Sequence, residues 1–187
     1  MCIRDSTTVG GLGVFLDGKA RDAADAQLAF EVGLPGVDGS AVRDVVEEAT
    51  NQQRVAVLRG HLEHVIAGRD PIQIEEARRI AEVAALAETD RQVCRVEHLA
   101  EAAGYSVRSL QRLFDQHVGQ SPAFVIRRWR IIEAAEAARL AMVDGEKWRG
   151  WAAVADELGY SDQAHLTRDF GRHLGVSPAA YVDRNRA

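Results

Sequence analysis

The sequence contains few of the residues that covalent cross-links and metal clusters require. Only two cysteines, Cys2 and Cys94, occur among the 187 residues. Two cysteines at this spacing form neither a disulfide framework nor a zinc–thiolate cluster. We expect Cys94 to be a small, partly buried residue near the start of a helix.

Long apolar runs are also missing from the chain. No stretch approaches the ~18 consecutive apolar residues of a membrane span, and no charged-then-apolar leader precedes a cleavage site. These absences predict a cytoplasmic protein without a membrane partner. The apolar fraction of 47% is nevertheless sufficient for a globular core.

An excess of positive charge, common in DNA-binding proteins, is absent overall but present locally. The net charge is −5. Residues 1–90 contain nine Lys/Arg and sixteen Asp/Glu, a formal charge of −7. Residues 91–187 contain fourteen Lys/Arg and twelve Asp/Glu, a formal charge of +2, and four of the six histidines. The asymmetry indicates an acidic regulatory half joined to a half that contacts DNA.

A pattern of turn and helix residues occurs twice in the second half. The first copy consists of Gly104-Tyr105-Ser106, Leu110, Phe114, Gly119 and Ser121-Pro122, and the second of Gly159-Tyr160-Ser161, Leu166, Phe170, Gly175 and Ser177-Pro178. The Gly-Tyr-Ser triplets lie 55 positions apart and the Ser-Pro pairs 56. One residue is therefore inserted, and we place it in the second recognition helix region, between Ser161 and Phe170. The two copies are then expected to present different side chains.

Each copy predicts a helix-turn-helix. In the first, residues 96–103 form the supporting helix and Gly104 the turn, where glycine tolerates a left-handed backbone. Ser106 is expected to cap the recognition helix, and Ser161 to do so in the second copy. The inward-facing apolar residues are Leu110, Leu113 and Phe114, then Leu166 and Phe170.

The outward-facing polar side chains are the candidates for DNA contact. They are Ser106, Arg108, Gln111, Arg112, Gln163, His165, Thr167 and Arg168, with Arg172 as a further candidate. Arginine can bond guanine, and glutamine can bond adenine, in the major groove. The alternative is that these side chains form an ordinary solvated helix surface, which their position on a helix would favour by itself. Asp162 and Asp169 would repel phosphate if they faced it, so we expect firmer base contacts from the first copy.

A long helix is predicted between the two copies, from Ser121-Pro122 to Asp144-Gly145. Roughly 20 helical residues span ~30 Å, close to the ~34 Å repeat of DNA, which suits two recognition helices in successive major grooves. Trp129, Trp148 and Trp151 are interpreted as core. Arg130 is either a phosphate contact, like Arg127 and Arg128, or an internal salt-bridge partner.

The first half shows weaker signals. Residues 14–16 predict a short strand, and helices are expected over 40–50, over 52–67 and from Pro71 onward. His61 and His64 are interpreted as a solvated helix face rather than a metal pair. The polar segment 88–91 is the predicted domain boundary.

Residues from about 93 to 184 resemble the DNA-binding domain of the AraC/XylS family of bacterial transcription regulators. The second copy carries most of that family signature, through Tyr181, and Arg130-Ile131 with Ala134 matches its linker helix. The resemblance implies a seven-helix domain whose DNA surface includes the residues matching Arg108, Gln111, Arg112, Gln163, Thr167 and Arg168. It also implies that residues 10–16 and 41–87 are the last strand and trailing helices of an effector or dimerisation domain.

These inferences predict a mainly α fold with two helix-turn-helix units, a long linker helix and a preceding helical remnant. Residues 1–6 are hypothesised to be a non-native leader, since a sequence that resembles a transposase-end sequencing adapter would encode them. The alternative is a genuine, unusual start. Residues 7–89 then form the partial regulatory domain and 90–187 the DNA-binding domain.

The predicted function is a sequence-specific transcription regulator without catalytic site, cofactor or metal. The expected partners are double-stranded promoter DNA, a second copy of the chain bound through the N-terminal half, and RNA polymerase. Two alternatives are a helical interaction module that binds no DNA and a relative of alkyl-transfer DNA-repair proteins. The latter chemistry needs a thiolate nucleophile, which Cys2 and Cys94 do not suit.

Overall fold

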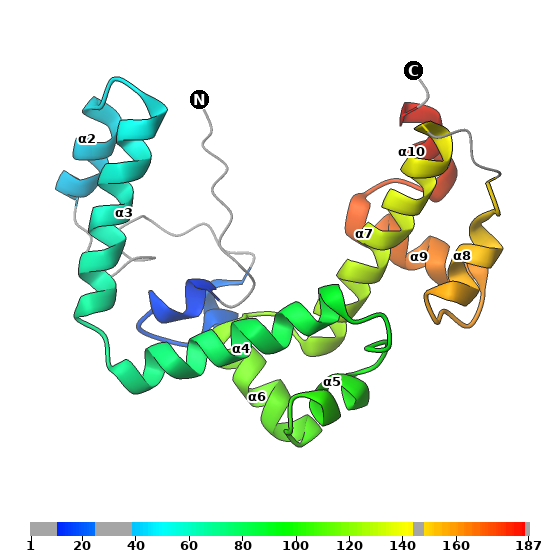
Figure 1. Cartoon of the computed structure of the whole chain (residues 1–187), viewed down its shortest axis with the longest axis horizontal. Helices are drawn as coiled ribbons and strands as arrows, with labels where there is room; N and C mark the ends of the chain where they lie inside the picture. The colour runs from blue at the N-terminus through cyan, green and yellow to red at the C-terminus, as the bar shows by residue number, and fades with distance from the viewer. Residues whose placement is uncertain (1–10, 25–38, 144–147, 186–187) are drawn as a thin grey trace. The chain divides into compact units, whose positions relative to one another are not determined.

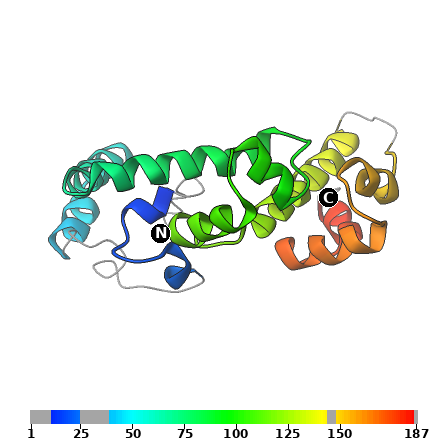
Figure 2. The ribbon, with the colours of Figure 1, turned by 90° about the horizontal axis from the view of Figure 1, so that it is seen from below.

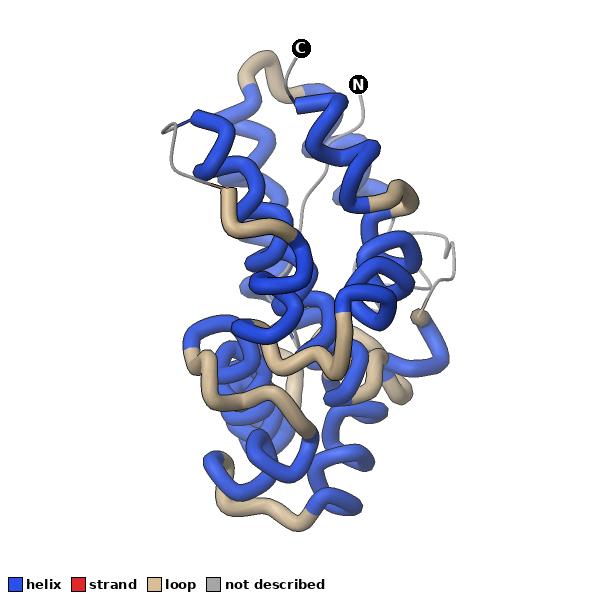
Figure 3. Tube along the Cα trace, turned by 90° about the vertical axis from the view of Figure 1, so that its right-hand side faces the viewer, coloured by secondary structure: helices blue, strands red, loops and turns tan. Residues whose placement is uncertain are grey.

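The computed structural model describes residues 11–24, 39–143 and 148–185, and every regular element in these ranges is a helix (Figure 3). The predicted leader, residues 1–6, lies outside them. The described residues form two compact units, one within Met1–Ala85 and Tyr105–Ser121 and the other within Leu86–Gly104 and Pro122–Ala187. The mainly α fold class is confirmed.

The first unit combines N-terminal helices with one helix from the middle of the chain. Its elements are the short 3-10 helices η1 (Gly11–Val14) and η2 (Ala20–Ala23), the helices α2 (Gly39–Glu47), α3 (Asn51–Ala67) and α6 (Val107–His117), and most of α4 (Pro71–Thr89) (Figure 1). Helices α2 and α3 pack side by side, and η1 and η2 pack on α6 (Figures 1 and 2). The helices predicted at 52–67 and from Pro71 are confirmed.

The strand predicted at residues 14–16 is wrong. Residues 11–14 form the 3-10 helix η1, and Phe15 follows in a turn. The Phe15 side chain is buried in a small cluster with Ala41 and Val65. Its carbonyl oxygen accepts a hydrogen bond from Arg69 Nη2 at 2.7 Å. A side-chain donor thus satisfies the backbone group that a neighbouring strand would have satisfied.

The second unit is built around one long helix. Its elements are the end of α4, the helices α5 (Val96–Ala102), α7 (Pro122–Val143), α8 (Trp151–Glu157), α9 (Gln163–Leu174) and α10 (Pro178–Asn185). Helix α7 packs against α5, α8, α9 and α10 (Figure 1). Its 22 residues correspond to about 33 Å, as predicted for the linker helix.

The core of this unit lies between α7, α8 and α9. It contains Ile131 and Ala134 from α7, Val154 and Ala155 from α8, and Leu166 and Phe170 from α9. Trp148 and Trp151 pack against this cluster, as expected. Trp129 is also half-buried and, like Trp148, lines a cavity, but it is not among the residues packed against this cluster.

Arg130 is buried inside the second unit, with 3% of its surface exposed. Its Nη1 donates to Glu133 Oε2 at 2.8 Å, and its Nη2 donates to the carbonyl oxygens of Asp90 and Val93 at 2.8 and 3.0 Å. Arg130 therefore ties the segment before α5 to helix α7. Of the two predicted roles, the internal salt bridge is correct.

Candidate nucleic-acid interface

Helix α6 is the first predicted recognition helix. Gly104 precedes it with φ of 70°, a left-handed conformation that favours glycine. Ser106 is its N-cap, and Ser106 Oγ accepts a hydrogen bond from the Ser109 backbone N–H at 3.1 Å. Leu110 and Phe114 are fully buried. The turn, the cap and the inward row of the first copy are as predicted.

Helix α9 is the second predicted recognition helix, and its cap differs from the prediction. Asp162, not Ser161, is the N-cap, and its Oδ1 accepts from the His165 backbone N–H at 2.6 Å. This bond holds the pKa of Asp162 below its usual value. The Ser161 hydroxyl lies before the helix, within 3.3 Å of Asp162 Oδ2 and His165 Nδ1.

The extra residue of the second copy therefore lies in the turn before α9 and not within the recognition helix. Counted from the N-caps Ser106 and Asp162, every position of α9 is the corresponding position of α6 plus 56. The fully buried Leu166 and Phe170 match Leu110 and Phe114. The inserted residue lies between Ser161 and Phe170, as predicted, but it changes which side chain caps the helix and leaves the register of the helix intact.

Most of the predicted contact residues lie exposed on these two helices. Arg108, Gln111 and Arg112 are exposed on α6, and Gln163 and Arg168 on α9. In the common register Arg112 corresponds to Arg168, Gln111 to Thr167, and Arg108 to Ala164. Thr167 is half-buried. The two helices therefore carry similar but unequal rows of polar side chains.

The two aspartates from which repulsion was predicted differ in exposure. Asp169 is buried, with 2% of its surface exposed, and its Oδ1 lies 3.4 Å from Arg172 Nη1. Its other oxygen lies 3.7 Å from His165 Nε2. Asp162 is exposed and caps the helix. Burial therefore keeps the Asp169 carboxylate from facing phosphate, and Arg172, a predicted DNA contact, is one of its partners, whereas repulsion from Asp162 stays a prediction.

Comparison with known proteins agrees with this geometry. Residues 99–184 match the family described as a helix-turn-helix domain. An uncharacterized HTH-type transcriptional regulator of Haemophilus influenzae is 24% identical over 143 residues, 76% of this chain and 46% of that protein. The probable transcription factor PqrA of Proteus vulgaris is 31% identical over 87 residues, 46% of this chain and 66% of that protein.

A putative AraC-like transcription regulator of Streptomyces antibioticus is 36% identical over 86 residues, 46% of this chain and 26% of that protein. Residues 99–184 are an AraC-type helix-turn-helix domain. The three relatives are described as transcription regulators or as a transcription factor. The chain spans 26–66% of the length of these three relatives. No solved structure matches the chain significantly.

Two predicted contact residues of the AraC-type domain also have structural roles. Ser106 Oγ both caps α6 and donates to Ser109 Oγ at 2.9 Å. The His165 ring lies edge-on to Tyr160, with centroids 5.1 Å apart, and its side chain is 44% exposed. Burial raises the pKa of Tyr160 well above its usual value. Contact of Ser106 and His165 with DNA stays a prediction.

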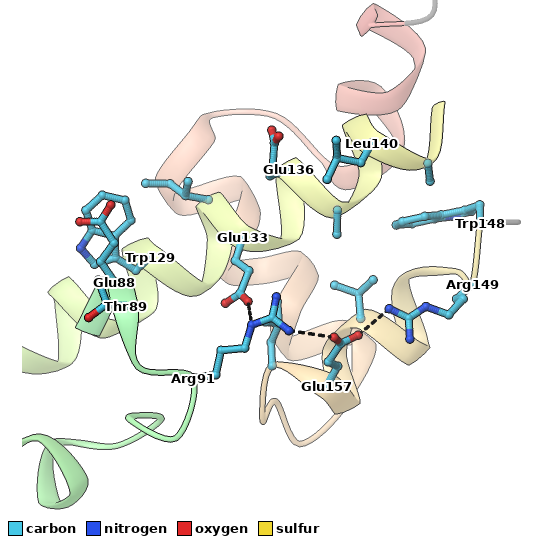
Figure 4. A pocket seen from close by; sticks show the side chains of 15 residues that line it. Glu88, Thr89, Arg91, Trp129, Glu133, Glu136, Leu140, Trp148, Arg149 and Glu157 are labelled. Carbon is cyan, nitrogen blue, oxygen red and sulfur yellow. Dashed lines mark hydrogen bonds and ion pairs between the residues drawn. The ribbon is translucent and has the colours of Figure 1, made fainter. Parts of the chain in front are cut away.

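A cavity of about 550 Å³ lies between α7 and α8 within the second unit (Figure 4). Trp129 and Trp148 line it, together with charged side chains that pair across it. Arg91 Nε lies 2.6 Å from Glu133 Oε1, and Arg149 Nη2 lies 2.7 Å from Glu157 Oε2. Arg91 also lies 3.5 Å from Glu157, so it connects the segment before α5 to both α7 and α8, and both arginines are engaged within the protein.

The described residues contain no group of three His, Cys, Asp or Glu side chains suited to a metal ion. None of the helices that the structure describes is long and apolar enough to cross a membrane. Cys94 is half-buried, and its Sγ donates to the Arg91 carbonyl oxygen at 3.2 Å.

Replacement of Asp162 by alanine is expected to destabilise α9, because the His165 N–H loses its acceptor at the helix start. Asp162→Asn should retain most of the stability, since asparagine is an equally good cap. The pKa of Asp162 is lowered in the folded state. Its contribution to the stability of the fold is therefore fully present above the ordinary aspartate pKa, and it is lost as the pH falls through the pKa of the folded state.

Urea unfolding followed by circular dichroism, at neutral and acid pH, measures this effect. The alanine variant should unfold at lower urea than the wild type at neutral pH, with a smaller difference in acid. The matched control is Ser161→Ala, which removes the predicted cap and should have little effect. A larger loss for Ser161→Ala than for Asp162→Ala would contradict the assignment of the cap.

Proposed function

We propose that the protein is a sequence-specific transcription regulator that binds double-stranded promoter DNA through α6 and α9. One observation carries the proposal: both helices bury leucine and phenylalanine at matching positions and expose arginine beside them. The buried row fixes the rotation of each helix, so the polar row points outward. This is the arrangement that helix-turn-helix proteins place in the major groove.

The chemistry of the exposed row suggests the role of each side chain. Arg108 and Arg112 suit bidentate bonds to guanine, and Gln111 suits adenine. On α9, Gln163 and Arg168 offer the same chemistry, and the methyl group of Thr167 suits thymine. Helix α6 carries two exposed arginines in this row where α9 has one, because Ala164 replaces Arg108. We therefore assign the stronger base contacts to α6.

The remaining assignments are part of the same proposal. Residues 7–89 would form the partial regulatory domain and 90–187 the DNA-binding domain, acting in the cytoplasm with RNA polymerase as a further partner. A homodimer through the N-terminal half is supported by three exposed valines, Val42 and Val46 on α2 and Val55 on α3. An interface between two copies would cover such apolar surface.

Replacement of Arg112 by alanine should weaken binding to the preferred DNA site by about 1–3 kcal/mol and relax the base preference at one position. Binding to random duplex should change much less. The site is first selected from random duplexes by the full chain, and affinities are then compared at one fixed salt concentration. Arg59→Ala on α3 is the control, since Arg59 is exposed and has no ion pair within the described residues.

Two outcomes would contradict the proposal in different ways. If the full chain enriches no sequence from random duplexes, sequence-specific regulation is wrong. If Arg112→Ala weakens binding equally on all duplexes, Arg112 contacts only phosphate, because phosphate contacts carry no direct sequence information.

A further inference from the structure

The N-terminal segment of residues 11–24, which contains η1 and η2, packs on the C-terminal end of helix α6. Two glycines allow the close approach. A Cβ atom on Gly13 would lie 2.5 Å from the His117 carbonyl oxygen. A Cβ atom on Gly119, whose φ is +80°, would lie 2.7 Å from the Ala20 carbonyl oxygen. The backbones therefore touch at two points, and Ala20 is 3% exposed.

Charged side chains hold the same segment in place. Arg69 forms an ion pair with Asp17 and donates to the Phe15 carbonyl oxygen. On the α6 side, Arg21 Nη1 lies 2.9 Å from Asp115 Oδ1. The end of α6 is also bonded to α4, since His117 Nε2 lies 3.0 Å from Glu76 Oε2. The segment is thus a fixed neighbour of the recognition helix.

Asp115 lies on the helical row that carries the proposed base contacts. It follows Arg112 by three residues, Gln111 by four and Arg108 by seven, the spacings that share one face of a helix. Its side chain is 40% exposed. A carboxylate on this face would repel the phosphates of bound DNA. At the matching position of α9 the sequence has Gly171, which carries no charge.

We infer that residues 11–24 are part of the DNA-binding face of the first helix-turn-helix, an inference that rests on the proposed function. Arg21 neutralises Asp115, the one carboxylate of the row. The Arg21 side chain is 60% exposed and is thus available to a DNA phosphate. The formal charges of the neighbouring Lys19 and Asp22 cancel. The positive charge that η2 brings to this face is therefore that of Arg21. Helix α9 requires no such segment because Gly171 replaces Asp115.

The test measures the affinity of the full chain for fluorescent random-sequence duplex and for the selected site at low salt. Arg21→Ala should weaken binding to both duplexes by about three- to tenfold, because the change is electrostatic. Adding Asp115→Asn to Arg21→Ala should return the affinity to within about twofold of the wild type. Arg59→Ala, which also removes one positive charge, should change it by less than about twofold.

A second variant acts on the whole segment. The side chain introduced by Gly13→Val would meet the His117 backbone and displace the segment from α6. We expect the same loss of affinity as for Arg21→Ala, and the same recovery when Asp115→Asn is added. Urea midpoints of the Arg21 variants should stay near that of the wild type, because the Arg21–Asp115 pair is exposed.

The outcomes separate this inference from the proposed function. Equal affinities of Arg21→Ala and Arg59→Ala, or tighter binding by Gly13→Val, would overturn the role of the segment. If Arg112→Ala weakens binding to the selected site while Arg21→Ala does not, only the present inference is wrong. If the wild-type chain binds neither duplex, the proposed function is wrong and the inference falls with it.

Discussion

Replacing Arg130 by methionine is expected to lower the free energy of unfolding by about 3–5 kcal/mol, because removal of one partner of a buried ion pair leaves the others unpaired. The Arg130 guanidinium is almost completely buried and bonds Glu133 and two backbone carbonyl oxygens. Methionine matches much of the side-chain volume but donates no hydrogen bond. The carbonyl oxygens of Asp90 and Val93 would lose their donor from α7.

The matched control is Arg128→Met, two residues earlier on the same helix. Arg128 is exposed, so the change should alter the free energy of unfolding by less than about 0.5 kcal/mol. Urea unfolding of the full chain measures both variants. An Arg130→Met variant as stable as the Arg128 control would show that these bonds contribute nothing to the net stability.

Replacing Phe170 by alanine is expected to lower the free energy of unfolding of the second unit by about 3–5 kcal/mol, since it leaves a cavity in the core. Phe170 is fully buried. Its ring makes edge contacts with Trp151 and Tyr181 at centroid distances of 5.4 and 5.5 Å. These contacts join α8, α9 and α10, so the loss should also weaken DNA binding by α9.

Phe170→Leu is the control that keeps most of the apolar volume, and it should cost about 1 kcal/mol. Tryptophan fluorescence reports the change locally, since Trp151 contacts the ring. The corresponding variant in the first copy, Phe114→Ala, should destabilise the first unit instead. Equal stability of Phe170→Ala and Phe170→Leu would contradict the cavity argument.

Local patterns predicted most of the helices and both inward-facing rows. Three local signals each predict a helix from residues that are close together in the sequence. They are the helical period of residues 52–67, the proline at the start of α4 and the Ser-Pro pair before α7. The buried Leu110 and Phe114 follow from a spacing of four residues. Such features depend on the backbone of one helix and need no knowledge of distant residues.

The predictions were wrong where the local structure depends on residues distant in the sequence, or where two adjacent residues could both cap a helix. The apolar residues 14–16 looked like a strand, yet Phe15 is held by Ala41, Val65 and Arg69. Before α9, Ser161 and Asp162 are adjacent, and serine and aspartate are both good N-caps. Cap preference therefore did not distinguish Ser161 from Asp162, which is the N-cap in the structure.

The duplicated helix-turn-helix and the polar residues at the start of each recognition helix were predictable from periodicity and short motifs. The AraC-type family was predictable from the resemblance of residues 93–184 to that family. Packing between distant segments decides that Arg130 bonds the segment before α5, that Asp169 is buried, and that Arg21 lies against Asp115. Burial and long-range ion pairs depend on which surfaces pack together, and short sequence patterns do not contain that information. Arg21 and Asp115 are 94 residues apart, and no local pattern connects them.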